Sequence, residues 1–564
     1  MDFAANSADR RHASEWLEPV AAGAMTTFLL VFFIRWLDDV HVNTMNGLWK
    51  SLRVAQWKAD LAAVPLDPSN YLYFPMMGIL CRALDLAGIH VGEAWRQMAI
   101  VNAGFAGVAV GIVFWLVRRL TGRSDVAALA ALVHLGCAFF FSLAVSNEDI
   151  MPSYTLVLAS MAMAAVWFAA PTAGQVVLVA AIFTLGWLTE WRLMFPTLPP
   201  LLLALALSQG GMLRRAGCIV LFLAAMIGTA LIVLTVFRGH PGAVGLPGVL
   251  WTGKGVRSGW SGVSLDKLGL VVVGMGEYWL GGHNIPSPDV TSPLASEWGL
   301  AFAAEMLALV LALVLLWRRR RDPALRTAAV VFIGTLVAGE VMNAYSQPQD
   351  PQMQINVMAW LAVVVALLVG RLSGGAGVRP VIMVLAFCCA LFPLAYNVRA
   401  FAPLRGRDGQ MVGAVRALES QTDPDRTVFV YAGFETIVAW QFALWGPNWE
   451  GVCDLGAAPQ AVPKFKWISL FGPLVHHPSW TDDEYAAAIR REIECAFDKG
   501  YRVVVGGLVW QKSPAELAEW MTSLNARARA PVLHALLHDN RRTIPLAKPI
   551  LDDSFVIYQE LVRP

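Results

Sequence analysis

Long apolar runs alternate with short polar segments over the first 400 residues of the chain. A helix needs about 20 apolar residues to cross the hydrocarbon core of a bilayer, and the runs are of about that length. They lie at about residues 19–36, 98–117, 126–144, 152–169, 174–189, 193–208, 216–237, 299–317, 327–345, 354–370 and 380–397. The pattern therefore predicts a polytopic α-helical membrane protein of about 11 spans.

After the last run, strand-length apolar segments alternate with amphipathic stretches. The expected strands lie at 427–433, 466–472, 501–510 and 554–562. Between them, Thr481 with Glu484 and Ser513 with Glu516 have the spacing of a capping box that opens a helix. This alternation predicts a small α/β domain with a largely parallel sheet over 398–564. No GxGxxG turn supports nucleotide binding there.

Composition agrees with a membrane protein, because 57% of the 564 residues are hydrophobic and only 15% are charged. A net charge of +2 gives no field that would favour nucleic acid. The seven cysteines show neither a CxxC motif nor Cys/His ligand spacing, which argues against a zinc or iron–sulfur site. Cys453 and Cys495 lie in the polar C-terminal part, where a disulfide and two buried thiols are equally open readings.

Arginines gather in the short loops on one side of the predicted spans. They are Arg118, Arg119, Arg123, Arg214, Arg215, Arg318 to Arg321, Arg326, Arg371 and Arg379. By the positive-inside rule that side is cytoplasmic, together with an N-terminal segment at 1–18. The membrane domain then covers 19–397, with outer loops at 37–97 and 238–298, and the domain at 398–564 is extracytoplasmic.

Two acidic pairs stand at outer span ends: Asp38 with Asp39 after the first span, and Glu148 with Asp149 in a short loop. Carboxylates at a membrane boundary are costly unless they are paired, hydrated or metal-bound. One carboxylate could act as a general base while another orients it or holds a divalent cation, Mg or Mn, between Asp39 and Asp149. A solvated helix end, and N-capping by Asp149, are the structural alternatives.

The first outer loop also carries Lys50, Arg53, Lys58 and Arg82 around an apolar stretch that contains Pro75, which we interpret as an interfacial helix. Such a surface suits a lipid phosphate, because the cations hold the charge while apolar side chains meet the acyl chain. Lysines that merely reach the interface are the alternative.

Polar and aromatic residues in the other outer loops suit sugar recognition. Arg192 follows the fifth span, and Tyr278 and His283 lie in the loop at 238–298. Rings can stack on the apolar faces of a sugar while donors bind its hydroxyls. For Arg192, the alternative is an ion pair with Glu190 beside an interfacial tryptophan.

The order of these features resembles membrane GT-C glycosyltransferases, and more narrowly the protein mannosyltransferase and lipid A aminoarabinose transferase branch. The resemblance is carried by the acidic pair at Asp38 and Asp39, the stretches Tyr71–Gly88 and Trp115–Gly122, and the acidic loop Asn147–Pro152. It covers residues 19 to about 210. The first motif is Leu-Asp-Asp rather than the Asp-Glu common in that branch, and no Trp-Trp-Asp-Tyr-Gly motif of oligosaccharyltransferases is present.

The resemblance implies an inverting glycosyltransferase that moves a sugar from a polyprenyl-phosphate donor to a lipid, glycan or protein hydroxyl on the periplasmic face. It assigns the catalytic acids to the two acidic pairs, and the donor phosphate to the basic residues of the first loop. It also implies a bacterial inner membrane, in agreement with the lack of Asn-x-Ser/Thr sequons in the external segments. The alternative from another class is a transporter or flippase of a lipid-linked glycan, although transporters often show repeats and ionisable groups near mid-membrane.

Overall fold

The computed structural model describes most of the chain. It covers residues 3–251 except 40–45, 61–64, 90–91 and 192–195, then scattered positions up to 368 and the helix at 323–345, and 379–563 except 432–435, 458–463, 478, 507–512, 523–529, 539–541 and 546–557. The chain divides into two compact units: Met1–Gly47 with Arg53–Arg405, and Leu48–Leu52 with Gly406–Pro564.

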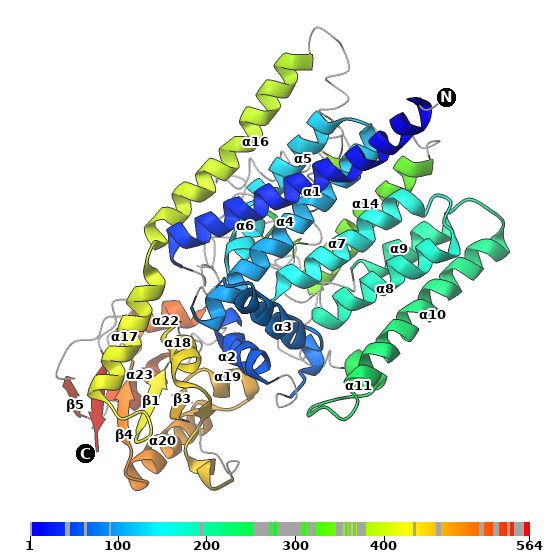
Figure 1. The fold of residues 1–564 in the computed structure, drawn as a ribbon. Helices are drawn as coiled ribbons and strands as arrows, with labels where there is room; N and C mark the ends of the chain where they lie inside the picture. Colours follow the sequence, from blue (N-terminus) through cyan, green and yellow to red (C-terminus); the bar gives the residue numbers. More distant parts are fainter. Residues whose placement is uncertain are drawn as a thin grey trace. The chain divides into compact units, whose positions relative to one another are not determined.

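The first unit is built from helices (Figure 1). Their bounds are α1 Phe3–Leu37, α2 Asn46–Ala59, α3 Tyr73–Leu86, α4 Ala94–Thr121, α5 Ser124–Gly136, α6 Ala138–Val145, α7 Ile150–Trp167, α8 Ala173–Thr189, α9 Leu198–Ala206, α10 Met212–Val236, α11 Leu246–Trp251, α14 Pro323–Tyr345 and α16 Arg379–Phe401. Within the described residues, six helices are long and apolar enough to cross a membrane, or seven if α5 and α6 form one broken span.

The predicted 11 spans are not confirmed as a number. The spans expected at 299–317 and 354–370 lie largely outside the described residues. The run expected as one span at 126–144 is two helices that meet at 74°. In the run at 193–208, the residues that the structure describes form the nine-residue α9. A run of apolar residues does not show where a helix breaks, so the sequence predicted continuous spans where the structure has broken or short helices.

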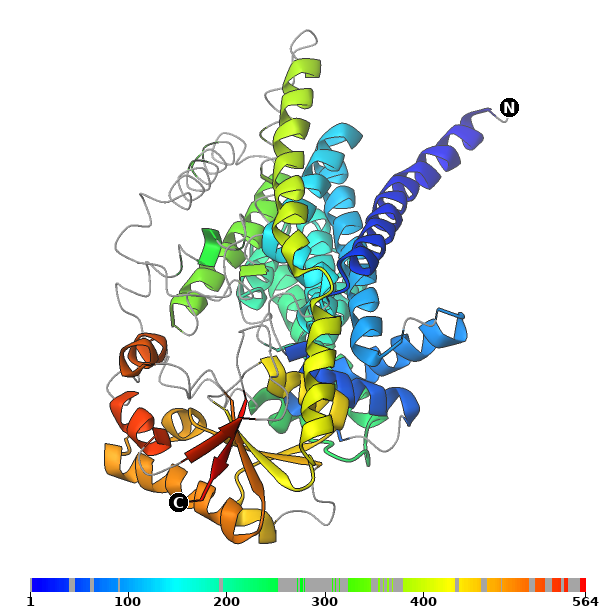
Figure 2. The ribbon, with the colours of Figure 1, turned by 90° about the vertical axis from the view of Figure 1, so that its left-hand side faces the viewer.

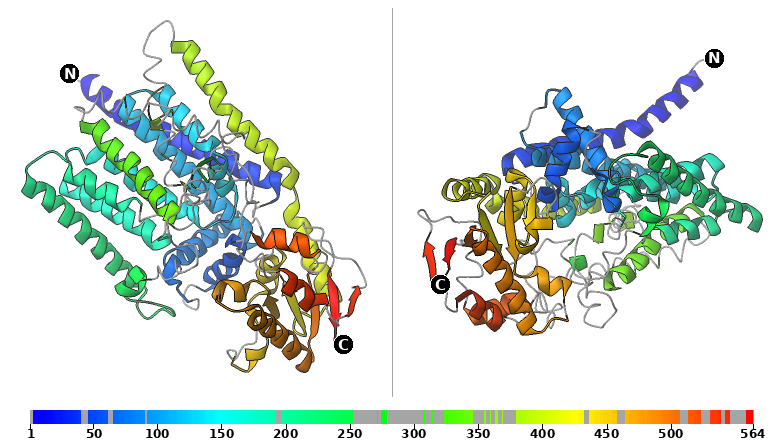
Figure 3. Two further views of the ribbon diagram at one scale, coloured as in Figure 1. Left: turned by 180° about the vertical axis from the view of Figure 1, so that it is seen from behind. Right: turned by 90° about the horizontal axis from the view of Figure 1, so that it is seen from below.

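Glycines bring α1 and α4 into close contact. A Cβ atom on Gly107 would meet the Oγ1 atom of Thr27 and the carbonyl oxygen of Gly23, and one on Gly111 would lie 2.8 Å from the carbonyl oxygen of Pro19. Small residues allow the backbones of membrane helices to approach each other in this way. Seen from behind, α4, α7, α8 and α10 follow one another across the unit (Figure 3).

The second unit is an α/β domain, as predicted. Its elements are α17 Arg407–Gln421, β1 Thr427–Tyr431, α18 Thr436–Trp445, β2 Asn448–Glu450, β3 Phe465–Ser469, α19 Gly472–His476, α20 Asp482–Asp498, β4 Arg502–Val505, α22 Pro514–Thr522, α23 Ala530–His538, β5 Arg542–Pro545 and β6 Gln559–Val562. The sheet has the order β2-β3-β1-β4-β6-β5. The first four strands are parallel, while β6 runs antiparallel to β4 and to β5.

Helices cover both faces of this sheet (Figure 2). On one face, Ile489 of α20 and Leu533 of α23 pack against strand residues such as Val428. On the other, the hydroxyl of Tyr431 donates to Gln441 of α18 at 2.8 Å. The capping box of Thr481 and Glu484 is present as predicted. Cys453 and Cys495 form a disulfide, which decides between the two readings left open by the sequence.

Candidate functional site

Four carboxylates are buried at the end of the first unit where α1 ends and α7 begins. Asp39, Glu148, Asp149 and Glu190 are each at most 1% exposed. The segment that follows Asp39 reaches the second acidic loop, because Gly47 lies in direct contact with the backbone oxygen of Asn147. The structure therefore brings the two predicted acidic loops to the same end of the helices. A buried carboxylate is costly, so four of them together indicate a functional region.

The side-chain amide of Asn70 joins two of these acids. Its Nδ2 atom donates to Asp149 Oδ2 at 3.0 Å and to Glu190 Oε2 at 3.0 Å, and lies 3.3 Å from the carbonyl oxygen of Thr189. Asn70 closes the short 3-10 turn Pro68–Asn70 before α3. One neutral side chain thus binds two acids that lie 79 and 120 residues farther along the chain.

Further polar side chains fix the loops on which the acids stand. The amide of Asn102, inside α4, donates to the carbonyl oxygens of Ser146 at 2.9 Å and of Glu148 at 2.5 Å. The hydroxyl of Ser153 donates to the carbonyl oxygen of Gly186 at 2.9 Å, which ties α7 to the last turn of α8. These backbone contacts leave the carboxylates themselves for other partners.

Asp149 occupies the N-cap position of α7, but its side chain makes no capping hydrogen bond. It accepts from Asn70 instead. The structural alternative considered from the sequence, helix capping by this carboxylate, is therefore not what the side chain does.

The adjacent residues Asp38 and Asp39 have different surroundings. Asp38 adopts a left-handed backbone conformation, with φ of 49°, and its carboxylate pairs with Arg96 at 2.7 Å while 45% of the side chain stays exposed. Asp39 is fully buried. An aspartate tolerates the left-handed region better than most residues, so this turn carries little strain. The turn separates a paired, hydrated acid from a buried one.

The phenol of Tyr73, in the first turn of α3, lies close enough to Glu148 to feel its charge. Burial raises the pKa of Tyr73 well above its ordinary value, and the negative charge of Glu148 raises it further. A phenol that stays protonated can only act here as a hydrogen-bonding group.

The four basic residues expected to bind phosphate have different surroundings. Lys58 bridges to Asp85 at 2.5 Å and donates to Gln97 at 2.9 Å, a closed network among α2, α3 and α4. Arg53 pairs with Asp67 at 3.1 Å and remains 47% exposed. Arg82 is exposed on α3, and Lys50 belongs to the segment that groups with the second unit.

Of the expected sugar-binding residues, only Tyr278 lies within the described residues. It is fully buried, with its ring centre 6.3 Å from that of Phe139. Arg192 and His283 lie outside them. Among the described residues, no three His, Cys, Asp or Glu side chains are arranged to hold a metal ion.

Asn70, Asn102 and Glu190 belong to this region, yet the sequence did not single out the two asparagines. Asn102 carried a usable signal, since a polar amide inside a predicted span is expensive unless it binds something. Asn70 carried none, because its turn between proline and an apolar stretch is typical of a surface loop. Glu190 was noticed only as half of an ion pair.

No family model matches the chain, and no curated protein matches its sequence. Solved structures do match over most of its length. ArnT from Cupriavidus metallidurans in the apo state aligns at 15% identity and a TM-score of 0.45, covering 97% of this chain and 98% of that one. The same protein bound to undecaprenyl phosphate aligns at 15% identity with a TM-score of 0.44, covering 96% and 97%.

The oligosaccharyltransferase of Archaeoglobus fulgidus, solved in complex with Zn and sulfate, aligns at 13% identity and a TM-score of 0.51. The match covers 91% of this chain and 70% of that one. At this identity the likeness concerns the fold. The chain therefore has a fold similar to that of an archaeal oligosaccharyltransferase, in agreement with the GT-C resemblance of its sequence.

Proposed function

We propose that this protein is a membrane glycosyltransferase that moves a sugar from a polyprenyl-phosphate donor to a hydroxyl acceptor. The observation that carries the proposal is the group of buried carboxylates, Asp39, Glu148, Asp149 and Glu190, at one end of apolar helices of spanning length. A donor whose tail lies in the bilayer presents its sugar–phosphate bond at the depth of span ends. Acids at the ends of spanning helices suit a bond at that depth.

In the proposed reaction, Asp39 is the general base. It takes the proton of the acceptor hydroxyl as the oxygen attacks the anomeric carbon, and the bond from that carbon to the phosphate oxygen breaks. The polyprenyl phosphate leaves with the electron pair, and because the acceptor oxygen attacks from the opposite face in a single displacement, configuration at the sugar is inverted. Asp39 fits this role better than Asp38, because Asp39 is buried at the span end whereas 45% of the Asp38 side chain is exposed.

Asp149, held by Asn70, orients the acceptor or the sugar hydroxyls on the other side of the site. A cation must meet the charge that accumulates on the departing phosphate. Of the four basic residues named from the sequence, Arg53 suits this best, because it is half exposed while Lys58 is enclosed in its network. The proposed reaction assigns no role to a metal ion, because the described residues do not form a set of metal ligands.

The orientation that goes with this function places the N-terminal segment in the cytoplasm and the α/β unit in the periplasm of a bacterial inner membrane. The disulfide between Cys453 and Cys495 supports it, because disulfides form and persist in oxidising compartments. The basic loops at the opposite span ends support it independently.

The test compares two neighbouring acids. In purified protein, we expect Asp39→Asn to lower transfer of a radiolabelled sugar from polyprenyl phosphate by at least about 1,000-fold, in the range that loss of a catalytic group causes. Asp38→Asn is the matched control, since asparagine tolerates the same left-handed turn, and it should retain transfer within about 10-fold. Equal activity of both variants and the wild type would refute the assignment of Asp39.

A second function is favoured by one observation. The 74° break between α5 and α6 resembles the discontinuous helices that line transport sites. A transporter or flippase would move a fluorescent lipid-linked sugar across vesicles containing the purified protein without transferring it. Movement without transfer, unchanged in Asp39→Asn, would favour that reading over the glycosyltransferase.

A further inference from the structure

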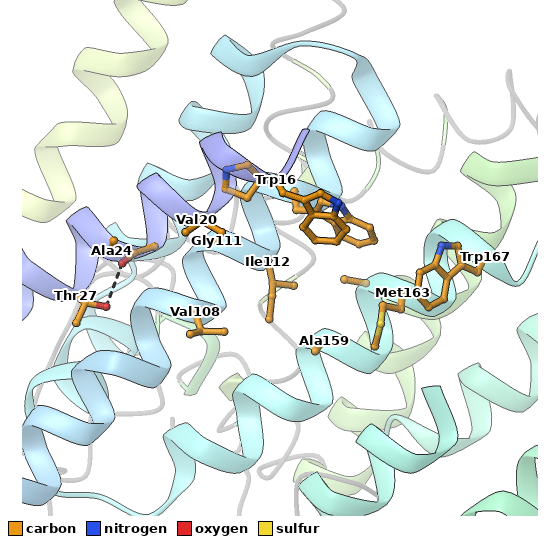
Figure 4. A pocket seen from close by; sticks show the side chains of 14 residues that line it. Trp16, Val20, Ala24, Thr27, Val108, Gly111, Ile112, Ala159, Met163 and Trp167 are labelled. Carbon is orange, nitrogen blue, oxygen red and sulfur yellow. Dashed lines mark hydrogen bonds between the residues drawn. The ribbon is translucent and has the colours of Figure 1, made fainter. Parts of the chain in front are cut away.

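A cavity of about 460 Å³ opens between α1, α4 and α7. Its walls include Val20 and Ala24 of α1, Val108 and Ile112 of α4, and Ala159 and Met163 of α7. Figure 4 shows these side chains on the three helices around the hollow. Its lining is almost wholly apolar. The hydroxyl of Thr27 donates to the carbonyl oxygen of Gly23 at 3.1 Å, so even this polar group is satisfied within its own helix.

The apolar lining of this cavity does not suit water. All three helices are candidate spans, and only 33% of the apolar window of α1 is buried inside the structure, so much of that helix faces the bilayer. An apolar cavity without polar partners stays dry. A hydrocarbon chain of a lipid is the occupant that the surroundings supply.

The cavity lies toward the end of the helices opposite the acids. Trp16 and Leu37 are the two ends of one 22-residue span, which corresponds to about 30 Å of helix. Trp16 borders the cavity, whereas Leu37 directly precedes the acidic pair. The cavity is therefore separate from the proposed transfer site.

Tryptophans and arginines mark the rim of the cavity. Trp16 stacks on Trp115 with ring centres 5.9 Å apart, and Trp167 borders the cavity from α7 (Figure 4). Tryptophans gather at the headgroup depth of a bilayer. Trp115 is 8% exposed and belongs to the cavity wall. The ring pair therefore marks this end of the cavity as the headgroup end.

One turn beyond Trp115, about 5 Å farther along α4, come Arg118 and Arg119. Arg118 pairs with Glu18 at 3.0 Å, and Arg119 is exposed. Cationic side chains at this position meet lipid phosphates and favour anionic headgroups. The order along α4 is thus an apolar wall, a gap of about one turn, and cations, which matches the acyl chain, the glycerol ester and the phosphate of a glycerophospholipid.

We propose that this cavity binds one acyl chain of an anionic glycerophospholipid, whose phosphate lies against the arginines at the end of α4. A polyprenyl phosphate fits the same rim less well, because its phosphate follows the hydrocarbon directly, whereas the arginines lie about 5 Å beyond Trp115, the last residue of α4 that lines the cavity. The site is independent of the transfer reaction and can be tested without turnover.

The test uses phosphatidylglycerol with a diazirine in one acyl chain, incorporated with the full-length protein into phosphatidylethanolamine nanodiscs. After irradiation, mass spectrometry should find the label concentrated on peptides that contain 16–27, 108–115 and 159–167. Ala159→Phe fills the cavity and should reduce this labelling at least fivefold. Ala224→Phe makes the same change on an exposed position of α10 and should leave it intact.

Val108→Trp, at a 54% exposed position of the cavity wall, repeats the filling in case Ala159→Phe does not yield folded protein. Arg119→Gln should lower labelling by phosphatidylglycerol but not by phosphatidylcholine carrying the same diazirine. Label spread evenly over all bilayer-facing helices, or unchanged in both filling variants, would overturn the proposal. So would displacement of the probe by an equimolar amount of polyprenyl phosphate.

Discussion

Two carboxylate arrangements, one in each unit of this protein, differ in the partner that holds the acid. In the α/β unit, Glu560 accepts two hydrogen bonds from Arg502, at 3.1 and 2.6 Å. In the membrane unit, Asp149 and Glu190 share the neutral amide of Asn70. An arginine brings an opposite charge to its acid, whereas the amide of Asn70 fixes the positions of two acids without adding a charge of its own. The first arrangement is an ion pair at a partly exposed surface, and the second is the kind of support that the proposed transfer site needs.

In the α/β unit, we expect the disulfide to make the largest single contribution to the free energy of unfolding. It closes a separation of 42 residues, which corresponds to about 4 kcal/mol of unfolding free energy in the chain-entropy model. We expect the double variant Cys453→Ser, Cys495→Ser to unfold at clearly lower denaturant, as followed by circular dichroism of the sheet unit. Transfer activity at low temperature should change little, and a large loss of activity at intact folding would break the division of roles.

Asn70→Ala tests the membrane side. Loss of the amide removes the group that positions Asp149 and Glu190. We therefore expect kcat/KM to fall by about 100-fold, which corresponds to ~2.7 kcal/mol of transition-state stabilisation. Asn397→Ala is the matched control, because it also removes a buried asparagine that donates to a carbonyl, that of Gly136. If both variants lose the same activity, the effect of Asn70 is a general loss of packing.

Glu560→Gln tests the arginine pair. The hydrogen bond to Glu560 raises the pKa of Arg502, but 40% of the arginine side chain is exposed. After discounting for solvent screening, we expect a loss of only about 0.5 kcal/mol of unfolding free energy. The difference from wild type should shrink in 1 M salt. A loss as large as that of the disulfide variant would contradict this ranking.

Glu450 gives the smallest expected effect. Burial raises the pKa of its carboxyl, while the nearby His476 lowers it. The folded state therefore binds a proton more tightly than the unfolded state, so the unfolding free energy falls as pH rises through the ordinary glutamate range up to the folded pKa. Glu450→Gln should flatten this slope in denaturant titrations between pH 4 and 7. A slope that steepens would contradict the sign.

The sequence predicted the acids at span ends and the long apolar helices, but not the contacts that a neutral side chain makes with residues far away in the chain. Asp39, Glu148 and Asp149 were found because carboxylates at span ends are costly. Asn70 was missed because its role depends on partners 79 and 120 residues away. Among strands, β1 and β3 follow apolar runs, whereas β2, with only Asn448–Glu450, owes its place to pairing with β3.

The left-handed turn at Asp38 limits which changes of sequence this segment of the chain tolerates. Because the turn sends one carboxylate to Arg96 and the next into the interior, the two neighbours are not interchangeable. Insertion of one residue between Leu37 and Asp38 would move Asp38 to the inward-facing position, and deletion of Asp38 would leave Asp39 at the position that pairs with Arg96. Relatives of this protein should therefore preserve the spacing from the helix end to the second aspartate more strictly than they preserve the identity of the first.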